Sequence, residues 1–123
     1  MRVLLIDDDP LLLDSLAALL QPRYDVVTAI GGECGLATFC QALVDGCPFG
    51  VVVTDLGMPR MDGYEFIQRI RKIAPRTPTI LLTGWGEQPG AVGALAGRAD
   101  REVAKPVRIE ELQEALGIVL SLG

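Results

Sequence analysis

Aliphatic runs of strand length alternate along the chain with segments whose apolar residues recur at helical spacing. Five strands are predicted, at Arg2–Asp7, Tyr24–Thr28, Val51–Asp55, Thr79–Thr83 and, shorter than the rest, Glu102–Ala104. The central runs are unbroken rather than alternating, which is typical of strands buried on both faces. We therefore expect an α/β fold, a doubly wound parallel sheet with helices on both faces.

Capping signals and apolar spacing predict helices between these strands. Asp9-Pro10 combines a helix N-cap with proline at the first helical position, and Gln21-Pro22 ends that helix. A second helix is predicted at Gly32–Val44, with Leu36, Phe39 and Leu43 on one face. A third begins at the capping box of Asp62 and Glu65 and runs through Ile73. The last is predicted from Ile109 through Val119.

Length and composition indicate a single globular domain spanning residues 1–123. The last helix runs almost to the C-terminus, so we expect no output or DNA-binding module within this chain. The net charge of −5 argues against a nucleic-acid surface. No apolar run reaches the ~18 residues of a membrane span, and no signal peptide is recognisable, so the cytoplasm is the expected compartment. The oligomeric state stays open.

Cysteine usage does not indicate a metal site. Cys34, Cys40 and Cys47 are odd in number and lack a paired-ligand spacing, and the chain has no histidine to complete a zinc site. We expect partly buried, reduced thiols on a helix and the loop after it.

Polar side chains gather at the ends of the predicted strands. Asp7 and Asp8 end the first strand, Asp55 the third, Thr83 the fourth and Lys105 the fifth. In a doubly wound sheet the carboxyl ends of the strands share one edge, where ligands bind. We therefore expect these five residues to converge, whereas Asp9 is explained by helix capping alone.

Three carboxylates without histidine or cysteine form a hard oxygen site that suits Mg²⁺. Carboxylates about 4 Å apart repel by ~4 kcal/mol at the effective dielectric of a protein surface, and a cation relieves this. A lysine and a threonine hydroxyl can bind phosphoryl oxygens, and an aspartate can be the nucleophile. The sequence therefore predicts Mg²⁺-dependent phosphoryl transfer to Asp55.

At these residues the chain resembles the receiver domain of two-component response regulators, the chemotaxis-regulator-like family. The resemblance covers essentially all 123 residues and rests on LLIDDDP, VVVTDLGMPRMDG, LLTG and AKPV in this order. It implies a flavodoxin-like, five-stranded sheet in the order 2-1-3-4-5. It also implies a signalling domain that catalyses its own phosphorylation and dephosphorylation, with a phosphohistidine donor on a sensor histidine kinase or a histidine phosphotransfer domain.

The resemblance also assigns roles to individual residues. Asp55 is the implied phosphoacceptor, and Asp8, Asp55 and the backbone carbonyl of Gly57 are the implied direct Mg²⁺ ligands, with Asp7 acting mainly through water. Thr83 and Lys105 are implied to hold phosphoryl oxygens. The implied loop positions that modulate the reaction are Gly57, Met58, Gly84 and Trp85. A cis peptide bond at Lys105-Pro106 is implied as well.

The chain departs from the family pattern in two places. The aromatic residue that family members usually carry three positions before the lysine is replaced by Glu102. The segment Gly84–Gly97, normally the fourth helix, is rich in glycine, which costs ~1 kcal/mol per interior helical position. We expect this segment to be the moving part on phosphorylation. The LLTGWG stretch and the absent aromatic residue resemble receivers attached to hybrid sensor kinases. The sequence leaves two alternatives, a free-standing receiver and a receiver excised from such a kinase.

Two alternatives belong to other classes. A degenerate receiver would act as a phosphate-independent binding module. The complete set of acidic, hydroxyl and lysine residues argues against this alternative. A haloacid-dehalogenase-type phosphatase would carry its nucleophile on the first strand in an Asp-x-Asp motif. Here the lone acceptor, Asp55, lies on the third strand ahead of Gly57-Met58-Pro59.

Overall fold

The computed structural model describes residues 1–84 and 99–121 of the chain. Its elements are β1 (Arg2–Asp7), α1 (Pro10–Leu20), β2 (Asp25–Ile30), α2 (Gly32–Val44), β3 (Val51–Asp55), α3 (Gly63–Ile73), β4 (Thr79–Thr83), β5 (Arg101–Ala104) and α5 (Ile109–Ser121). The expectations for the glycine-rich segment Gly84–Gly97 and for Trp85 lie outside the described residues, Gly84 excepted.

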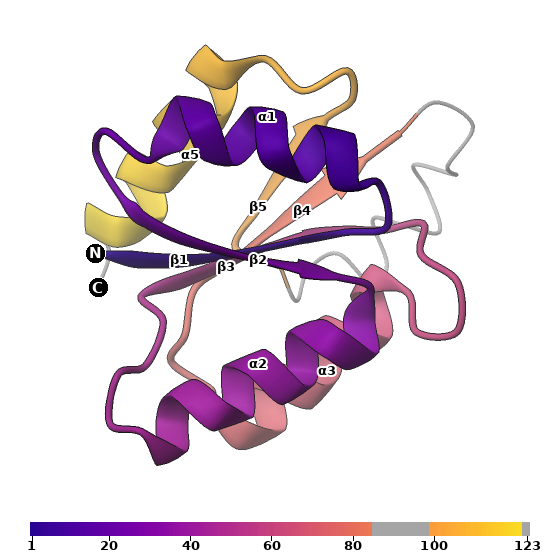
Figure 1. Ribbon diagram of the computed structural model, residues 1–123, viewed down its shortest axis with the longest axis vertical. Coiled ribbons are helices and arrows are strands. Elements are labelled where there is room, and N and C mark those ends of the chain that lie inside the picture. Colours follow the sequence, from indigo (N-terminus) through magenta and orange to yellow (C-terminus); the bar gives the residue numbers. More distant parts are fainter. Residues whose placement is uncertain (85–98, 122–123) are drawn as a thin grey trace.

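The five strands form one parallel sheet in the order β2-β1-β3-β4-β5. Helices α1 and α5 cover one face of this sheet, and α2 and α3 cover the other (Figure 1). The predicted fold class and strand order are therefore confirmed. The strand order reverses between β1 and β3, so the carboxyl ends of these two strands open the crevice in which ligands of such sheets bind.

Successive residues of the central strands enter different halves of the core. Val3 and Leu5 of β1 pack in the cluster beneath α1 and α5, whereas Leu4 and Ile6 pack in the cluster beneath α2 and α3. All four side chains are fully buried. This two-sided burial is why the strands read as unbroken aliphatic runs, and it holds their polar ends at a fixed level.

Aspartate caps the N-termini of two helices, α1 and α3, as predicted. The Asp9 carboxylate accepts hydrogen bonds from the backbone N–H groups of Leu11 and Leu12, and Pro10 follows at the first helical position. At the start of α3, the Asp62 carboxylate accepts from the Glu65 N–H at 2.9 Å. These caps satisfy backbone donors that have no partner inside their helices.

Helix α2 has the predicted bounds but buries a different set of residues. Of the three residues predicted to share one face, Phe39 is buried and Leu36 is half-buried, whereas Leu43 is 37% exposed. The helix turns Gly35 toward the sheet instead. A Cβ atom at Gly35 would lie 2.5 Å from Ile6 Cδ1, so α2 packs close against β1 at this point.

Two strands differ from their predicted bounds. β2 is Asp25–Ile30 where the pattern predicts Tyr24–Thr28, and β5 begins one residue earlier than predicted, at Arg101. Ile30 extends β2 although its side chain is 57% exposed, because the strand continues to pair with β1 there. Within the described residues, no helix combines the length and the apolar character needed to cross a membrane.

The three cysteines carry free thiols. Cys40 is half-buried as expected, but Cys34 and Cys47 are exposed, so the expectation of partial burial is wrong for these two residues. Cys34 lies in the first turn of α2, and Cys47 lies in the loop that follows the same helix.

Helix α3 begins in direct contact with the end of β3. The Gly63 N–H donates to the Leu56 carbonyl at 2.9 Å. A Cβ atom at Gly63 would lie 2.5 Å from the Asp55 carbonyl oxygen and 2.9 Å from Leu56 Cα. Only glycine allows this approach, which fixes the backbone at the carboxyl end of β3.

We expect Gly63→Ala to lower the free energy of unfolding by about 1–3 kcal/mol, because the new methyl group overlaps backbone atoms. Gly117→Ala is the matched control: this glycine lies in α5 with open space around it, so alanine should raise stability by roughly 0.5–1 kcal/mol. Urea denaturation measures both changes. An equal change in the free energy of unfolding for the two variants would show that the backbone of β3 does not lie close enough to Gly63 to exclude a methyl group.

Candidate functional site

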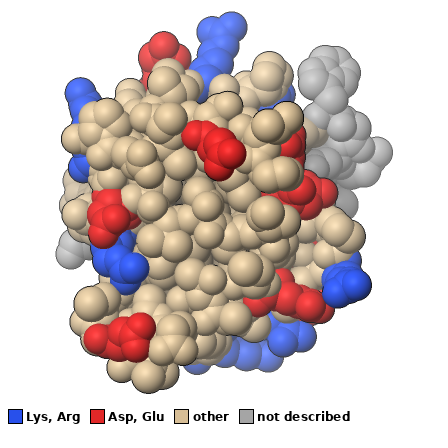
Figure 2. Space-filling model, viewed as in Figure 1, with Lys and Arg blue, Asp and Glu red and all other residues tan. Residues whose placement is uncertain are grey.

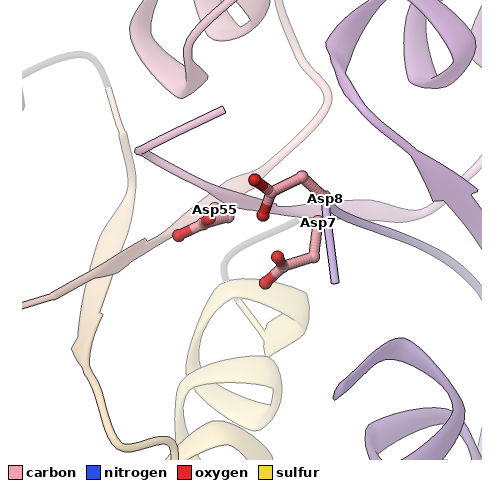
Figure 3. Close-up of side chains that lie close together, drawn as sticks. All are labelled: Asp7, Asp8 and Asp55. Atoms are coloured by element: carbon pink, nitrogen blue, oxygen red, sulfur yellow. The ribbon is translucent and has the colours of Figure 1, made fainter. Parts of the chain in front are cut away.

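Three carboxylates meet where β1 and β3 end. Asp7 is the last residue of β1, Asp8 follows it, and Asp55 is the last residue of β3, the neighbouring strand. One carboxylate oxygen of each lies within 4.8 Å of those of the other two. The side chains are directed toward a common space (Figure 3). Asp7 and Asp55 are buried, at 2% and 4% exposure, and Asp8 is exposed.

Lys105 brings one positive charge to the buried pair. It follows β5, and its Nζ lies 2.7 Å from Asp55 Oδ1 and 3.5 Å from Asp7 Oδ2. The Lys105 N–H donates to the Thr83 carbonyl at 2.6 Å, which holds the lysine backbone against the end of β4. The expected cis peptide bond between Lys105 and Pro106 is present.

The site changes the proton affinity of two of its groups. The pKa of Asp7 is raised to about 6, first because the carboxyl is buried and then because Asp8 and the charge of Asp55 lie beside it. The Asp9 N–H and Lys105 act in the opposite direction. Burial lowers the pKa of Lys105, but its hydrogen bond to Asp55 and the charges of Asp55 and Asp7 outweigh this, so that pKa is raised.

Thr83 and Gly84 lie at the same edge of the sheet. Asp55 pairs with Leu82 in the register of β3 and β4, so Thr83 lies one residue beyond the acceptor position on the neighbouring strand. Thr83 in turn pairs with Ala104, the residue before Lys105. Both Thr83 and Gly84 are half-buried.

The loop after β3 folds back on itself before α3 begins. The Met58 N–H donates to the Leu56 carbonyl, and the Met61 N–H donates to the Pro59 carbonyl at 2.8 Å. The second of these three-residue turns places Arg60 at a φ of 69°, a conformation uncommon outside glycine. Gly57 is exposed beside Asp55, whereas the Met58 side chain is buried in the core beneath α2 and α3.

The structure brings together most of the residues predicted from the sequence. Asp7, Asp8, Asp55 and Lys105 are in contact range, and Thr83 lies on the adjoining strand end. Glu102 is not part of this group: it is exposed on β5, as expected for a carboxylate without a buried partner. Sequence reasoning missed the role of Gly63 in shaping the loop, although a glycine directly after the helix cap Asp62 was a possible signal.

The donor set suits a hard divalent cation. Among the described residues, three carboxylates offer their oxygens to one common space, and oxygen ligands are those that such cations prefer. Asp7 Oδ2 is buried and, apart from its 3.5 Å ion pair with Lys105, has no hydrogen-bond partner among the described residues, so it keeps acceptor capacity that a cation would use. With one ammonium facing three carboxylates, the site retains negative charge and can attract a cation.

The family model of the response regulator receiver domain matches residues 3–117. Among curated proteins, the transcriptional regulatory protein GlrR of Escherichia coli (strain K12) is 38% identical over 116 residues, which cover 94% of this chain and 25% of GlrR. Response regulator protein PmrA of Pseudomonas aeruginosa is 34% identical over 92% of this chain and 49% of its own length. The chain thus spans a quarter to half of these relatives.

Solved structures match the whole fold. A response regulator receiver domain protein from Clostridium thermocellum has a TM-score of 0.87 and 30% identity, covering 98% of this chain and 94% of that one. Response regulator protein TrrA from Thermotoga maritima, in complex with Mg²⁺-BeF, has a TM-score of 0.83 and 29% identity, covering 96% of this chain and 97% of that one.

The raised pKa of Asp7 predicts a pH dependence of stability in metal-free protein. The pKa of Asp7 is about 6 in the folded state and 3.8 ordinarily, so the folded protein binds the proton more tightly than the unfolded chain does. The resulting contribution to the free energy of unfolding is fully present below pH 3.8 and is lost as the pH rises through about 6. Asp7→Asn removes the ionisable group. Its gain in unfolding free energy over the wild type should therefore shrink as the pH falls from about 7 to about 4.

Urea denaturation in the presence of a chelator measures this difference. Asp14→Asn, at an exposed position in the middle of α1, is the control and should show no such trend. A constant gain for Asp7→Asn across the pH range would contradict the assignment of the raised pKa to Asp7.

Proposed function

The chain belongs to the response regulator receiver domain family of two-component signalling systems, and on this basis we propose that it accepts a phosphoryl group on Asp55 in a Mg²⁺-dependent reaction. The observation that carries the proposal is the position of Asp55. It is buried at the carboxyl end of a central strand, 2.7 Å from an ammonium and grouped with two further carboxylates. Such a carboxylate is held in place for attack on a phosphorus atom.

Asp7, Asp8, Asp55 and the Gly57 carbonyl would hold the metal ion. All are hard oxygen donors, and Asp7 Oδ2, whose neighbour among the described residues is the Lys105 ammonium at 3.5 Å and which accepts no hydrogen bond there, supports a cation at this position. When bound, Mg²⁺ supplies positive charge that offsets the charge of the carboxylates and of the phosphoryl oxygens. The related protein TrrA was crystallised with Mg²⁺-BeF, which agrees with this choice of ion.

In the transfer, a carboxylate oxygen of Asp55 attacks the phosphorus of a phosphohistidine. The oxygen–phosphorus bond forms while the phosphorus–nitrogen bond breaks, and the electron pair of the broken bond stays on the imidazole nitrogen. Lys105 can hold a phosphoryl oxygen, because its ammonium already lies against Asp55 and remains 28% exposed. The Thr83 hydroxyl has the corresponding role from the end of β4.

The same residues would promote loss of the phosphoryl group. Water attacks the phosphorus while the phosphorus–oxygen bond to Asp55 breaks, Asp55 leaves as a carboxylate that Lys105 stabilises, and a proton of the water stays with the inorganic phosphate or passes to solvent. In this proposal the domain catalyses both steps on itself and turns over no separate substrate. The donor is a sensor histidine kinase or a histidine phosphotransfer domain, which must present its imidazole at the edge where β1 and β3 end.

Intact-mass spectrometry after incubation with Mg²⁺ and acetyl phosphate tests the acceptor. We expect the wild type to gain a single phosphate and Asp55→Asn to gain none. Asp62→Asn is the matched control, because this exposed residue lies in the same loop and asparagine preserves its helix cap. A full-yield adduct in Asp55→Asn would refute the assignment.

The same experiment separates the alternative classes. Turnover of acetyl phosphate that persists in Asp55→Asn would indicate a phosphatase with another nucleophile. No reaction of the folded wild type would indicate a phosphate-independent binding module.

Metal linkage gives a second prediction. Mg²⁺ should stabilise the wild type by RT ln(1 + [L]/Kd), about 2.7 kcal/mol at a hundredfold excess over Kd. Asp8→Ala should raise the metal-free melting temperature, since one of three mutually repelling charges is removed, and it should abolish the Mg²⁺ response. Asp9→Asn keeps the cap of α1 and should respond as the wild type does. An undiminished Mg²⁺ response in Asp8→Ala would remove this residue from the ligand set.

A further inference from the structure

Few polar side chains lie in the core of this protein. Charged side chains stand on the outside of the molecule, as the space-filling view shows for one side (Figure 2). Among the described residues, the buried polar side chains are those of Asp7, Thr54, Asp55 and Thr79. The aspartates belong to the candidate site. Burial of a hydroxyl group costs free energy unless the group is hydrogen-bonded, so the two threonines, both at 0% exposure, need partners.

The partner of Thr79 has a structural role. Thr79 begins β4, at the amino ends of the strands and away from Asp55. Its hydroxyl lies 3.3 Å from Asp100 Oδ2, and its N–H donates to the same oxygen at 2.7 Å. Arg71 also pairs with Asp100. This threonine therefore joins the start of β4 to the residue that precedes β5.

The hydroxyl of Thr54 instead contacts the backbone of the proposed acceptor. Thr54 is two residues after Val52 and so shares its side of β3, beneath α2 and α3. The Thr54 hydroxyl donates to the Asp55 carbonyl at 3.1 Å. That carbonyl lies beyond the last register pair of β1 with β3, which joins Ile6 to Thr54. The hydroxyl thus supplies a donor where the pairing with β1 has ended.

Two further contacts hold the peptide group between Asp55 and Leu56. The Leu56 N–H donates to the Leu82 carbonyl on β4 at 3.0 Å. The backbone of Gly63 approaches the Asp55 carbonyl so closely that a Cβ atom would lie 2.5 Å from its oxygen. The carbonyl end of this peptide group is therefore held by Thr54 and Gly63, and its amide end by β4.

We propose that Thr54 is a positioning residue, which holds Asp55 and Gly57 in the orientation that metal binding and phosphoryl transfer require. The inference rests on the function proposed above. The peptide group after Asp55 connects the acceptor to Gly57, whose carbonyl would be a metal ligand. Rotation of this group would move the Gly57 carbonyl relative to the Asp55 side chain. The Thr54 hydroxyl opposes the rotation, because the Asp55 carbonyl would lose its donor.

The sequence of β3 agrees with this role. The strand is Val51-Val52-Val53-Thr54-Asp55, and every residue of it is buried. Valine has nearly the shape of threonine but no O–H group. If packing were the only requirement at position 54, a fourth valine would fill the space without burying a polar atom. Threonine differs from valine here by the donor that the Asp55 carbonyl accepts from.

Two measurements on the full chain test this role. Calorimetric titration gives the dissociation constant for Mg²⁺, and intact-mass spectrometry over time gives the rate constant of phosphorylation by acetyl phosphate at saturating Mg²⁺. Thr54→Val should raise the first and lower the second, each roughly tenfold, as expected when a hydrogen bond that orients a metal ligand is lost. Thr54→Ser keeps the donor and should retain both wild-type values. A purely structural role predicts the reverse order, because serine leaves a cavity and valine does not.

Thr79→Val is the matched control. It removes a second fully buried hydroxyl, from the neighbouring strand, and should lower the melting temperature while leaving the Mg²⁺ dissociation constant and the rate constant unaltered. Circular dichroism confirms folding at the assay temperature. Thr54→Ala, which also lacks the donor, takes the place of Thr54→Val if the latter does not fold.

A wild-type value of either quantity in the folded donor-free variant would overturn the role of Thr54. Equal losses in Thr79→Val would overturn it as well, since lower stability would then account for them. A wild type that binds Mg²⁺ but gains no phosphate would contradict the proposed function instead, and the Mg²⁺ dissociation constants would still decide whether Thr54 positions the ligands. A wild type that neither binds Mg²⁺ nor gains phosphate would remove both proposals.

Discussion

Two buried carboxylates, those of Asp7 and Asp55, share the single ammonium of Lys105, and the chemistry of the domain depends on this unequal pairing. One positive charge holds both side chains at the edge of the sheet but does not neutralise them together with Asp8. Burial and the neighbouring carboxylates raise the pKa of Asp7. In the proposed function, the remaining negative charge attracts the cation and Asp55 is the nucleophile. The parallel sheet serves this arrangement by bringing three distant parts of the chain to one level.

Much of the fold could be predicted because the strands end in polar residues. The aliphatic runs that stop at Asp7, Asp55 and Thr83 gave the bounds of β1, β3 and β4, and parallel topology then implied that these ends meet. Packing depth could not be predicted in the same way. Periodicity places Leu43 on the same helical face as Phe39, but it does not show that Gly35 lies close against β1 or that Leu43 stays partly exposed. The contact of Gly63 with Asp55 is likewise a tertiary property.

Glu102 stands where the sequence resemblance predicts an aromatic residue. The side chain is exposed on β5 and lines a shallow hollow together with Glu111 and Glu114 of α5. An aromatic ring could be buried or released at such a position, whereas a carboxylate among two others stays in water. The surface between β5 and α5 is therefore acidic, and a partner that reads the state of the domain there must recognise charge rather than a ring.

The order of the site residues along the chain has a consequence for biosynthesis. Asp7 and Asp55 leave the ribosome well before Lys105, which follows the last strand. Until β5 docks against β4, the two carboxylates have no ammonium near them, and their mutual repulsion opposes closure of the sheet edge. Docking of the final strand thus supplies both the last backbone pairing and the missing counter-charge. A nascent chain that lacks β5 has Asp55, the proposed acceptor, but not the ammonium that lies against it in the folded domain.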